Sequence, residues 1–278
     1  MHPFQILLAK WSSSFYRGNK YACNLCGFEA KKLRFRGHNH PVIQRKKIIS
    51  AGKRRSDCPN CLSSDRDRRL WLYLENAITP QSNILHIAPE YPVAIKMRNL
   101  SKSMGFHYHC LDKRTQGYYY PKWVLNGDIT SLEFADSQFD WVIANHVLEH
   151  IPNLQSALNE VKRVLKPTGK AIFMVPLSQS QPTEEGCITV NGQWCCELSK
   201  KEKIERFGQY DHLRLFGTDM DQIFKKMGFD LIFLSHENTE KAISHKSPLA
   251  LFANECIPIA TPTASPNVDN INAISSIP

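Results

Sequence analysis

Between residues 83 and 176 the chain carries four strand-like segments, and polar residues follow three of them. The segments read NILHIAPE, YHCLDKR, FDWVIANHVLEHI and GKAIFMVP, and a shorter one, VLNGDI, lies between the second and the third. Asp112, Asp128 and Asn145 each stand at or just after the end of an apolar run. Because an open parallel sheet binds its ligand outside the carboxyl ends of its strands, these residues predict one ligand site.

Helical patterns alternate with these strands, which is typical of βαβ units. Leucine and valine recur at helical spacing between residues 154 and 165, and further helices are predicted over 69–77, 92–103 and 218–227. The nearly continuous apolar run 139–144 suits a strand covered by helices on both faces. Two more strands are predicted over 229–234 and 249–253. We therefore predict an α/β fold with a doubly wound, mostly parallel sheet of seven strands.

The composition divides the chain into four zones. Residues 1–20 are predicted to be a lead-in segment, and residues 21–70 a small basic module with two CxxC pairs. Residues 71–253 form the α/β domain, in which residues 177–216 show no clear periodicity and suggest an insertion over the ligand site. Residues 254–278, rich in Pro, Thr, Ser, Ala and Asn and with almost no charge, are predicted to be a disordered tail.

The net charge of +9 is concentrated at the front of the chain. Residues 1–70 hold 16 basic and 4 acidic residues, which leaves the remainder slightly acidic. Such a patch can bind a polyanion, RNA or an anionic glycan, although a solvated basic surface around a small module is an equal alternative. No apolar run approaches the roughly 20 residues that span a bilayer, and no signal peptide is recognisable. We expect a cytoplasmic protein without a membrane span.

The two CxxC pairs, Cys23–Cys26 and Cys58–Cys61, predict a structural zinc site. Two thiolates three residues apart can face one ion, and two such pairs complete a tetrahedral shell of four sulfurs. The connecting loop is long enough for His38 or His40 to replace one sulfur, and unpaired reduced cysteines are the alternative. A zinc ion with four protein ligands has no open position, so the site is predicted to support folding and not catalysis.

The polar residues at the strand ends suit a nucleoside cofactor. A carboxylate in the position of Asp112 can accept hydrogen bonds from both hydroxyls of a ribose. Asp128 and Ile129 could bind an adenine amino group and pack on its ring, while Asn145 and His146 lie at the centre of the sheet's carboxyl edge. Asp112 alone could equally be an ordinary surface residue, and Asp128 and Ile129 alone are a weak signal, so the prediction depends on the order and spacing of these residues within one sheet.

The block SQFDWVIANHVLEHIPNLQSALNEVKRVLKPTGKAIFMVP, residues 137–176, resembles class I S-adenosylmethionine-dependent methyltransferases of the type 11 kind. The resemblance extends over about residues 80–235, and CPNCLSSDRDRRLWLYL resembles members with a cysteine-paired front module. It implies a Rossmann-like sheet and S-adenosylmethionine as cofactor. It also implies that Asp112 holds the ribose, Asp128 and Ile129 the adenine, and Asn145 and His146 the methionine moiety.

The first loop departs from that family. Its usual pattern is acidic-x-Gly-x-Gly, whereas this chain reads His86-Ile87-Ala88-Pro89-Glu90. Ala88 is small enough to replace a glycine, but Pro89 removes a backbone donor. Glu90 could instead meet the ammonium or sulfonium group of the cofactor. The predicted cofactor contacts of this loop are therefore His86, Ala88 and Glu90.

Three histidines, His146, His150 and His212, are the predicted general bases, because a histidine can take a proton near neutral pH. The leading hypothesis is a methyltransferase acting on a small-molecule or glycan-type acceptor. The alternatives are an RNA methyltransferase and a non-catalytic, zinc- and polyanion-binding protein on this fold. Residues 28–55 contain only Phe28 and Phe35 as aromatic residues, which disfavours base stacking on RNA.

Overall fold

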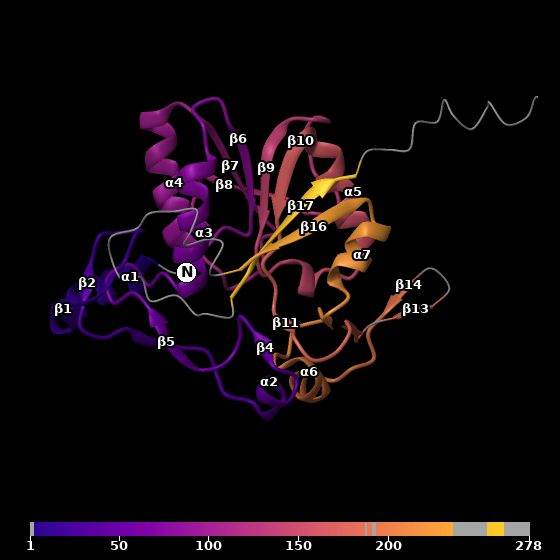
Figure 1. Ribbon diagram of the computed structural model, residues 1–278, viewed down its shortest axis with the longest axis horizontal. Coiled ribbons are helices and arrows are strands. Elements are labelled where there is room, and N and C mark those ends of the chain that lie inside the picture. The colour runs from indigo at the N-terminus through magenta and orange to yellow at the C-terminus, as the bar shows by residue number, and fades with distance from the viewer. Residues whose placement is uncertain (1–2, 187, 191–192, 236–254, 264–278) are drawn as a thin grey trace, which may run out of the picture.

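The computed structural model describes residues 3–186, 188–190, 193–235 and 255–263 (Figure 1). Its centre is a seven-stranded sheet in the order β16-β17-β10-β9-β6-β7-β8. Strand β17 is antiparallel to both neighbours, and the other paired strands are parallel. The predicted α/β class with a mostly parallel seven-stranded sheet is confirmed. The strands are β6 (Asn83–Ile87), β7 (His107–Asp112), β8 (Val124–Asn126), β9 (Phe139–Ala144), β10 (Leu165–Ile172), β16 (Phe229–Leu234) and β17 (Ile257–Pro262).

Helices cover both faces of this sheet, as a doubly wound fold requires. Figure 1 shows α3 and α4 on one side of the sheet and α5 and α7 on the other. Along β9 the buried side chains alternate between the two cores: Trp141 and Ile143 pack with α3 and α4, whereas Val142 and Ala144 pack with α5 and α7. The four helices are α3 (Asp65–Ala77), α4 (Tyr91–Met104), α5 (Leu154–Val164) and α7 (Met220–Lys226).

The prediction of a disordered tail over residues 254–278 is wrong for residues 257–262. They form β17, which lies inside the sheet between β10 and β16, and Ile257 and Ala260 are fully buried. Neighbouring strands on both sides supply the hydrogen bonds and the apolar contacts that this short, proline-containing segment could not supply itself. The strand predicted over residues 249–253 lies outside the described residues, as do residues 264–278.

The N-terminal region folds as a small module of short elements beside the sheet (Figure 1). Strand β1 pairs with β2 and β3 pairs with β5. The module already starts at Arg17, and α1 occupies most of the predicted lead-in segment. The elements of the N-terminal region are α1 (Pro3–Ser13), η1 (Ser14–Tyr16), β1 (Arg17–Ala22), β2 (Glu29–Ala30), β3 (Arg34–Arg36), α2 (Pro41–Arg45), β4 (Ile48–Ile49) and β5 (Arg54–Asp57).

Helix α3 joins the module to the α/β domain. It begins four residues before the predicted start, because Ser64 and Asp67 form a capping box there. In a capping box each of the two side chains accepts a hydrogen bond from the backbone N–H of the other residue, which satisfies donors that the first turn leaves free. The helix therefore runs through the domain boundary predicted at residues 70 and 71.

The insertion, residues 177–216, is more regular than predicted. Helix α6 begins at a second capping box, formed by Ser199 and Glu202, and ends at Gly208, whose φ is +82°. Strand β11 pairs with β4 of the module, and Lys46 forms an ion pair with Glu184. The insertion is thus anchored on the module. Its elements are β11 (Leu177–Ser178), β12 (Glu184–Glu185), β13 (Ile188–Val190), β14 (Gln193–Cys195), α6 (Lys200–Phe207) and β15 (Arg214–Leu215).

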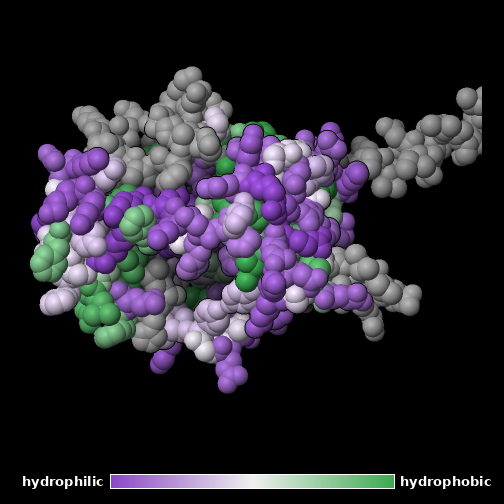
Figure 2. All heavy atoms as spheres, turned by 90° about the horizontal axis from the view of Figure 1, so that it is seen from below, coloured by the Kyte–Doolittle hydropathy of each residue, from purple (hydrophilic) through white to green (hydrophobic). Residues whose placement is uncertain are grey.

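The face drawn in Figure 2 is mainly hydrophilic, with hydrophobic side chains gathered on the side of the N-terminal region. That region carries exposed apolar residues in and after α1, among them Leu7, Trp11 and Phe15 at 64, 79 and 71% exposure. Among the helices in the described part of the chain, none combines the length and the apolar character that crossing a bilayer requires.

Candidate active site

A first cavity, of about 800 Å³, opens at the carboxyl ends of the parallel strands. The chain runs from β6 to β7 and β8 on one side and returns to β9 and β10 on the other. Such a reversal between β6 and β9 leaves a crevice where open α/β sheets bind ligands. The lining residues come from the ends of β6, β7 and β9, from the loops before and after β8, from the start of α5 and from the insertion. They are Ile87, Ala88, Asp112, Lys113, Thr115, Tyr118, Tyr120, Gly127, Asp128, Ile129, Thr130, His146, Val147, His150, Ile151, Pro152, Asn153, Ser156 and Asp211.

The structure brings six of the predicted site residues to this cavity: Ala88, Asp112, Asp128, Ile129, His146 and His150. Ala88 adopts φ of +48°, a left-handed conformation that glycine adopts without cost. The first loop therefore keeps the backbone shape of a glycine turn. The amide of Ala88 donates to the carbonyl of Leu111 at 2.7 Å.

The two aspartates differ in their surroundings. Asp112 is half-buried, and burial raises the pKa of its carboxyl above the ordinary value despite a hydrogen bond from the backbone of Lys113. Asp128 accepts hydrogen bonds from both the backbone and the hydroxyl of Thr130 and from Lys113. Although burial opposes it, these contacts lower the pKa of Asp128. Both aspartates present hydrogen-bond acceptors at the cavity.

Three further predicted residues lie outside the set that lines the first cavity. His86 is fully buried, and its ring nitrogens contact the hydroxyl of Tyr108 at 2.8 Å and the carboxylate of Glu90 at 2.9 Å. Burial alone would raise the pKa of Glu90, but the contact with His86 lowers it. Asn145 is also buried, and its Oδ1 accepts a hydrogen bond from the backbone of Met174. These three side chains stabilise the strand ends behind the cavity.

A second cavity, of about 680 Å³, lies between the module, the insertion and the sheet. Basic and histidine side chains of the module and of α3 line it, and so does the loop that follows α6. The lining residues are Arg36, Gly37, His38, Asn39, His40, Ile43, Ser50, Ala51, Gly52, Arg54, Arg66, His146, Glu149, His150, Pro176, Ile204, Phe207, Gly208, Gln209, Tyr210 and His212. His146 and His150 line both cavities. The two cavities therefore adjoin at these side chains.

His146 is held at the junction by charged neighbours. Its φ of +53° is unfavourable for a residue with a side chain. Its Nδ1 lies 3.2 Å from the carboxylate of Glu149, and the guanidinium of Arg66 lies 2.5 Å from Nε2 and 3.2 Å from Nδ1. Glu149 is 1% exposed, and although burial raises its pKa, the hydrogen bond with His146 and the nearby histidines outweigh that effect and lower the pKa below the ordinary value. A proton on Nδ1 suits these contacts, because the carboxylate accepts and the guanidinium donates.

His150 and His212 also lie close to Glu149. The 3₁₀ helix η2 (Leu148–His150) presents His150, whose Nδ1 donates to the carbonyl of Asp211 at 3.1 Å. The rings of His150 and His212 meet edge to face with centroids 5.0 Å apart. His212 is 4% exposed, and burial lowers its pKa to about 4. All three predicted histidines thus converge on one carboxylate.

Two residues of this arrangement are missing from the sequence prediction, Arg66 and Glu149. Glu149 stands between two predicted histidines in the segment HVLEH, and that spacing was the available signal. Arg66 lies in the first turn of α3, next to the cysteine module and 80 residues before His146, so its contact with the site depends on tertiary structure alone.

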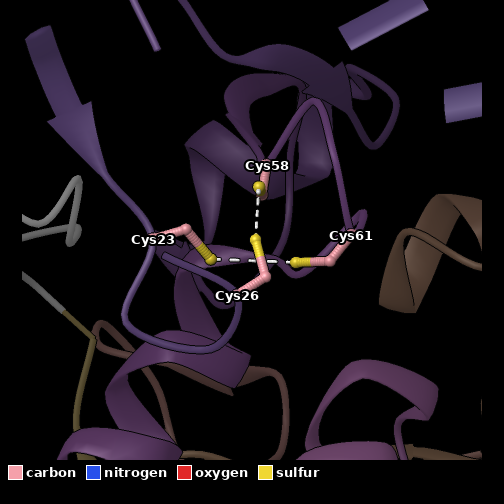
Figure 3. A group of neighbouring side chains, drawn as sticks. All are labelled: Cys23, Cys26, Cys58 and Cys61. Atoms are coloured by element: carbon pink, nitrogen blue, oxygen red, sulfur yellow. Dashed lines mark hydrogen bonds between the residues drawn. The ribbon is translucent and has the colours of Figure 1, made fainter. Parts of the chain in front are cut away.

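The four predicted metal ligands also converge (Figure 3). The sulfurs of Cys23 and Cys61 are 3.7 Å apart, as are those of Cys26 and Cys58, and all four lie within 4.8 Å of one another. A tetrahedron with bonds of 2.3 Å has edges of about 3.8 Å, so this spacing fits zinc. The hydroxyl of Ser63 contacts two of the sulfurs at 3.2 Å. His38 and His40 line the second cavity and are not part of this cluster.

Known proteins match the centre of the chain. Residues 103–173 match the family model described as a methyltransferase domain. The demethylmenaquinone methyltransferase of Staphylococcus epidermidis is 43% identical over 60 residues, which are 22% of this chain and 24% of that protein. The uncharacterized protein YafE of Escherichia coli is 41% identical over 59 residues, 21% of this chain and 28% of that protein. The chain spans about a quarter of the length of the curated relatives it matches.

Solved structures align over more of the chain with low identity. A sarcosine dimethylglycine methyltransferase candidate of Galdieria sulphuraria is 16% identical, with a TM-score of 0.38, and covers 62% of this chain and 64% of its own. The 1,6-didemethyltoxoflavin-N1-methyltransferase of Burkholderia thailandensis is 13% identical, with a TM-score of 0.43. The alignment covers 72% of this chain and 78% of that protein. The fold assignment therefore depends on the sheet order and the family match: residues 103–173 match the methyltransferase domain model, and the seven-stranded sheet around them has the Rossmann-like methyltransferase fold.

Proposed function

We propose that this protein is an S-adenosylmethionine-dependent methyltransferase whose acceptor is a small molecule bound in the second cavity. One observation carries the proposal: the two cavities adjoin at His146 and His150. A cofactor in the first cavity and an acceptor in the second would meet there. In-line transfer of a methyl group depends mainly on such an alignment of two reactants.

The residues of the first cavity fit this cofactor. The carboxylate of Asp112 is half-buried at the end of β7, where it can accept from the ribose hydroxyls. Asp128 and Ile129 would bind the adenine, and the left-handed turn at Ala88 leaves room for close approach. S-adenosylmethionine supplies an electrophilic methyl carbon on a sulfonium centre. His86, Glu90 and Asn145 would support these contacts from behind the cavity, in place of the direct contacts that the sequence suggested.

The second cavity favours an acceptor with an anionic group and a nucleophile that bears a proton. Among the described residues, no carboxylate lies within ion-pair distance of Arg66, whereas Arg36 and Arg54 are paired with Asp57 and Asp65. An anionic group can therefore bind Arg66. When Arg66 turns to that group, it frees Nε2 of His146 to take a proton from the acceptor.

A small acceptor is also favoured over RNA. The ion pairs of Arg36 and Arg54 reduce the positive charge that the module offers to a polyanion. A cavity of about 680 Å³ suits a single small molecule or one glycan unit. The four cysteines are proposed to hold a structural zinc ion, with His38 and His40 remaining in the acceptor cavity.

Calorimetric titration of the purified, zinc-loaded protein with S-adenosylmethionine tests the proposal. We expect saturable binding of one equivalent, with NADH as a control ligand that does not bind. Incubation with isotopically labelled cofactor and fractionated metabolites should then label a small anionic compound. A folded, zinc-loaded protein that fails to bind S-adenosylmethionine would rule out the enzyme, and label on RNA alone would identify the other acceptor class.

A further inference from the structure

Glu149, His150 and His212 form a second cluster of potential metal ligands at the surface of the second cavity. One ligand atom from each residue lies within 4.8 Å of the others. Glu149 and His212 are 1% and 4% exposed, and His150 is about one-third exposed at its side chain. The cluster contains no cysteine and is distinct from the four-cysteine site of the module.

The hydrogen bonds in this cluster leave nitrogen and oxygen atoms available to bind a cation. His150 uses its Nδ1 proton for the carbonyl of Asp211, so in the neutral ring Nε2 carries a lone pair. That nitrogen faces Oε1 of Glu149 at 3.9 Å, which is too far for a hydrogen bond. Oε2 of Glu149 and Nδ1 of His212 are buried and have no hydrogen-bond partner in the described structure. Buried polar atoms without partners are uncommon, and their grouping here suits the binding of a cation.

The surrounding chain holds this cluster in place. Arg214 is 1% exposed and donates hydrogen bonds to the carbonyls of Leu148 and Ile151, on either side of the two ligands. The carbonyl of Asp211 orients the ring of His150, as backbone acceptors orient metal-bound histidines in general. His146 contacts Oε1 of Glu149 at 3.2 Å and borders the first cavity. These contacts give a fixed set of ligands beside the proposed point of methyl transfer.

We propose that Glu149, His150 and His212 bind a divalent transition-metal ion that holds the acceptor for methylation. Two imidazoles and one carboxylate suit Zn²⁺, Fe²⁺ or Mn²⁺, and three protein ligands leave positions open toward the second cavity. An acceptor hydroxyl or amine bound there loses its proton more readily. The proton passes to Nε2 of His146. The freed electron pair of the acceptor forms the new bond to the methyl carbon as the carbon–sulfur bond breaks, and the sulfur leaves as a neutral thioether. The catalytic part of this inference depends on the proposed function, whereas the metal site itself does not.

Cobalt titration of the protein purified with its zinc tests the site. Co²⁺ bound by nitrogen and oxygen absorbs in the visible range without the thiolate-to-metal charge-transfer band that a cysteine site would add. We expect a d–d band that saturates at one added equivalent, and its loss in both Glu149→Gln and His212→Ala. His107→Ala, at an exposed histidine on β7, should titrate as the wild type does. His150→Gln replaces either variant if it fails to fold.

Two outcomes would overturn the metal site: a folded wild type without the band, or cluster variants that bind Co²⁺ as the wild type does. Calorimetry with S-adenosylmethionine on the same samples separates this inference from the proposed function. Loss of cofactor binding with the cobalt band intact would contradict the methyltransferase and leave the metal site standing. Cofactor binding without the cobalt band would contradict the metal site and leave the methyltransferase standing.

Discussion

At the scale of single residues, Asp112 is the most direct test of the cofactor assignment. Asp112→Ala removes the half-buried carboxylate from the first cavity. Loss of hydrogen bonds to a charged group should weaken S-adenosylmethionine binding by about 10- to 100-fold. Calorimetry measures this change, and circular dichroism should show an intact fold. Asp230→Ala, at an exposed aspartate on β16, is the control and should leave the affinity unchanged. Equal affinities in the two variants would exclude Asp112 from the site.

Single residues also explain what the sequence could and could not predict about the site. Asp112, Asp128 and His146 were predictable because the ends of parallel strands must meet at one edge. Arg66 was not, because its position follows from how the module packs on the domain. His86 and Glu90 were placed in the correct loop, but they satisfy each other at 2.9 Å behind the cavity.

At the scale of secondary-structure elements, β17 is the strand whose contribution to stability was least visible in the sequence. Ile257→Ala removes a fully buried side chain between β10 and β16. Such a truncation should lower the free energy of unfolding by about 2–5 kcal/mol, measured by urea titration. Ile232→Ala makes the same change on the adjacent β16, where the side chain is 60% exposed, and should cost less than about 0.5 kcal/mol. Similar losses for both would indicate that β17 contributes little.

This element also marks the boundary of what local pattern can predict. Strands such as β9 were evident from six nearly continuous apolar residues, whereas IPIATP contains two prolines and no charge. Composition describes how a segment behaves alone. β17 is stabilised by two neighbouring strands, and neither the pairing nor its antiparallel direction is encoded in those six residues.

The contact between the insertion and the module should depend on pH through Glu184. This carboxylate pairs with Lys46 of the module and with Arg206 of α6. Burial alone would raise its pKa, but the two cations lower it below the ordinary value of 4.5. The stabilisation is therefore fully present above pH 4.5 and is lost as the pH falls through the lower, folded-state pKa. Glu184→Gln should melt below the wild type at pH 6, and the difference should shrink toward pH 3. A constant difference would exclude the ion pairs as its cause.

At the scale of the whole molecule, the two cavities depend on different parts of the chain. The lining of the first begins at Ile87 and includes no residue of the module, whereas the module supplies about half of the lining of the second. Different parts of the proposed enzyme would therefore bind the two reactants. The sheet would bind the cofactor, and the cysteine module and the insertion would enclose the acceptor. The sequence predicted each part separately, but not that the module completes the site.

Loss of the proposed zinc should therefore separate the two halves of the site. Cys58→Ser removes a buried ligand of the four-cysteine cluster, and structural zinc sites fold only with their metal. We expect the variant to lose one zinc equivalent and to be cleaved faster by protease within residues 17–62. Its dissociation constant for S-adenosylmethionine should change by less than about threefold, because that cavity lies in the part of the fold that stays closed. Cys256→Ser, at a half-buried cysteine outside the cluster, should match the wild type in all three measurements. A parallel loss of cofactor binding would mean that module and sheet fold as one cooperative unit, joined through α3.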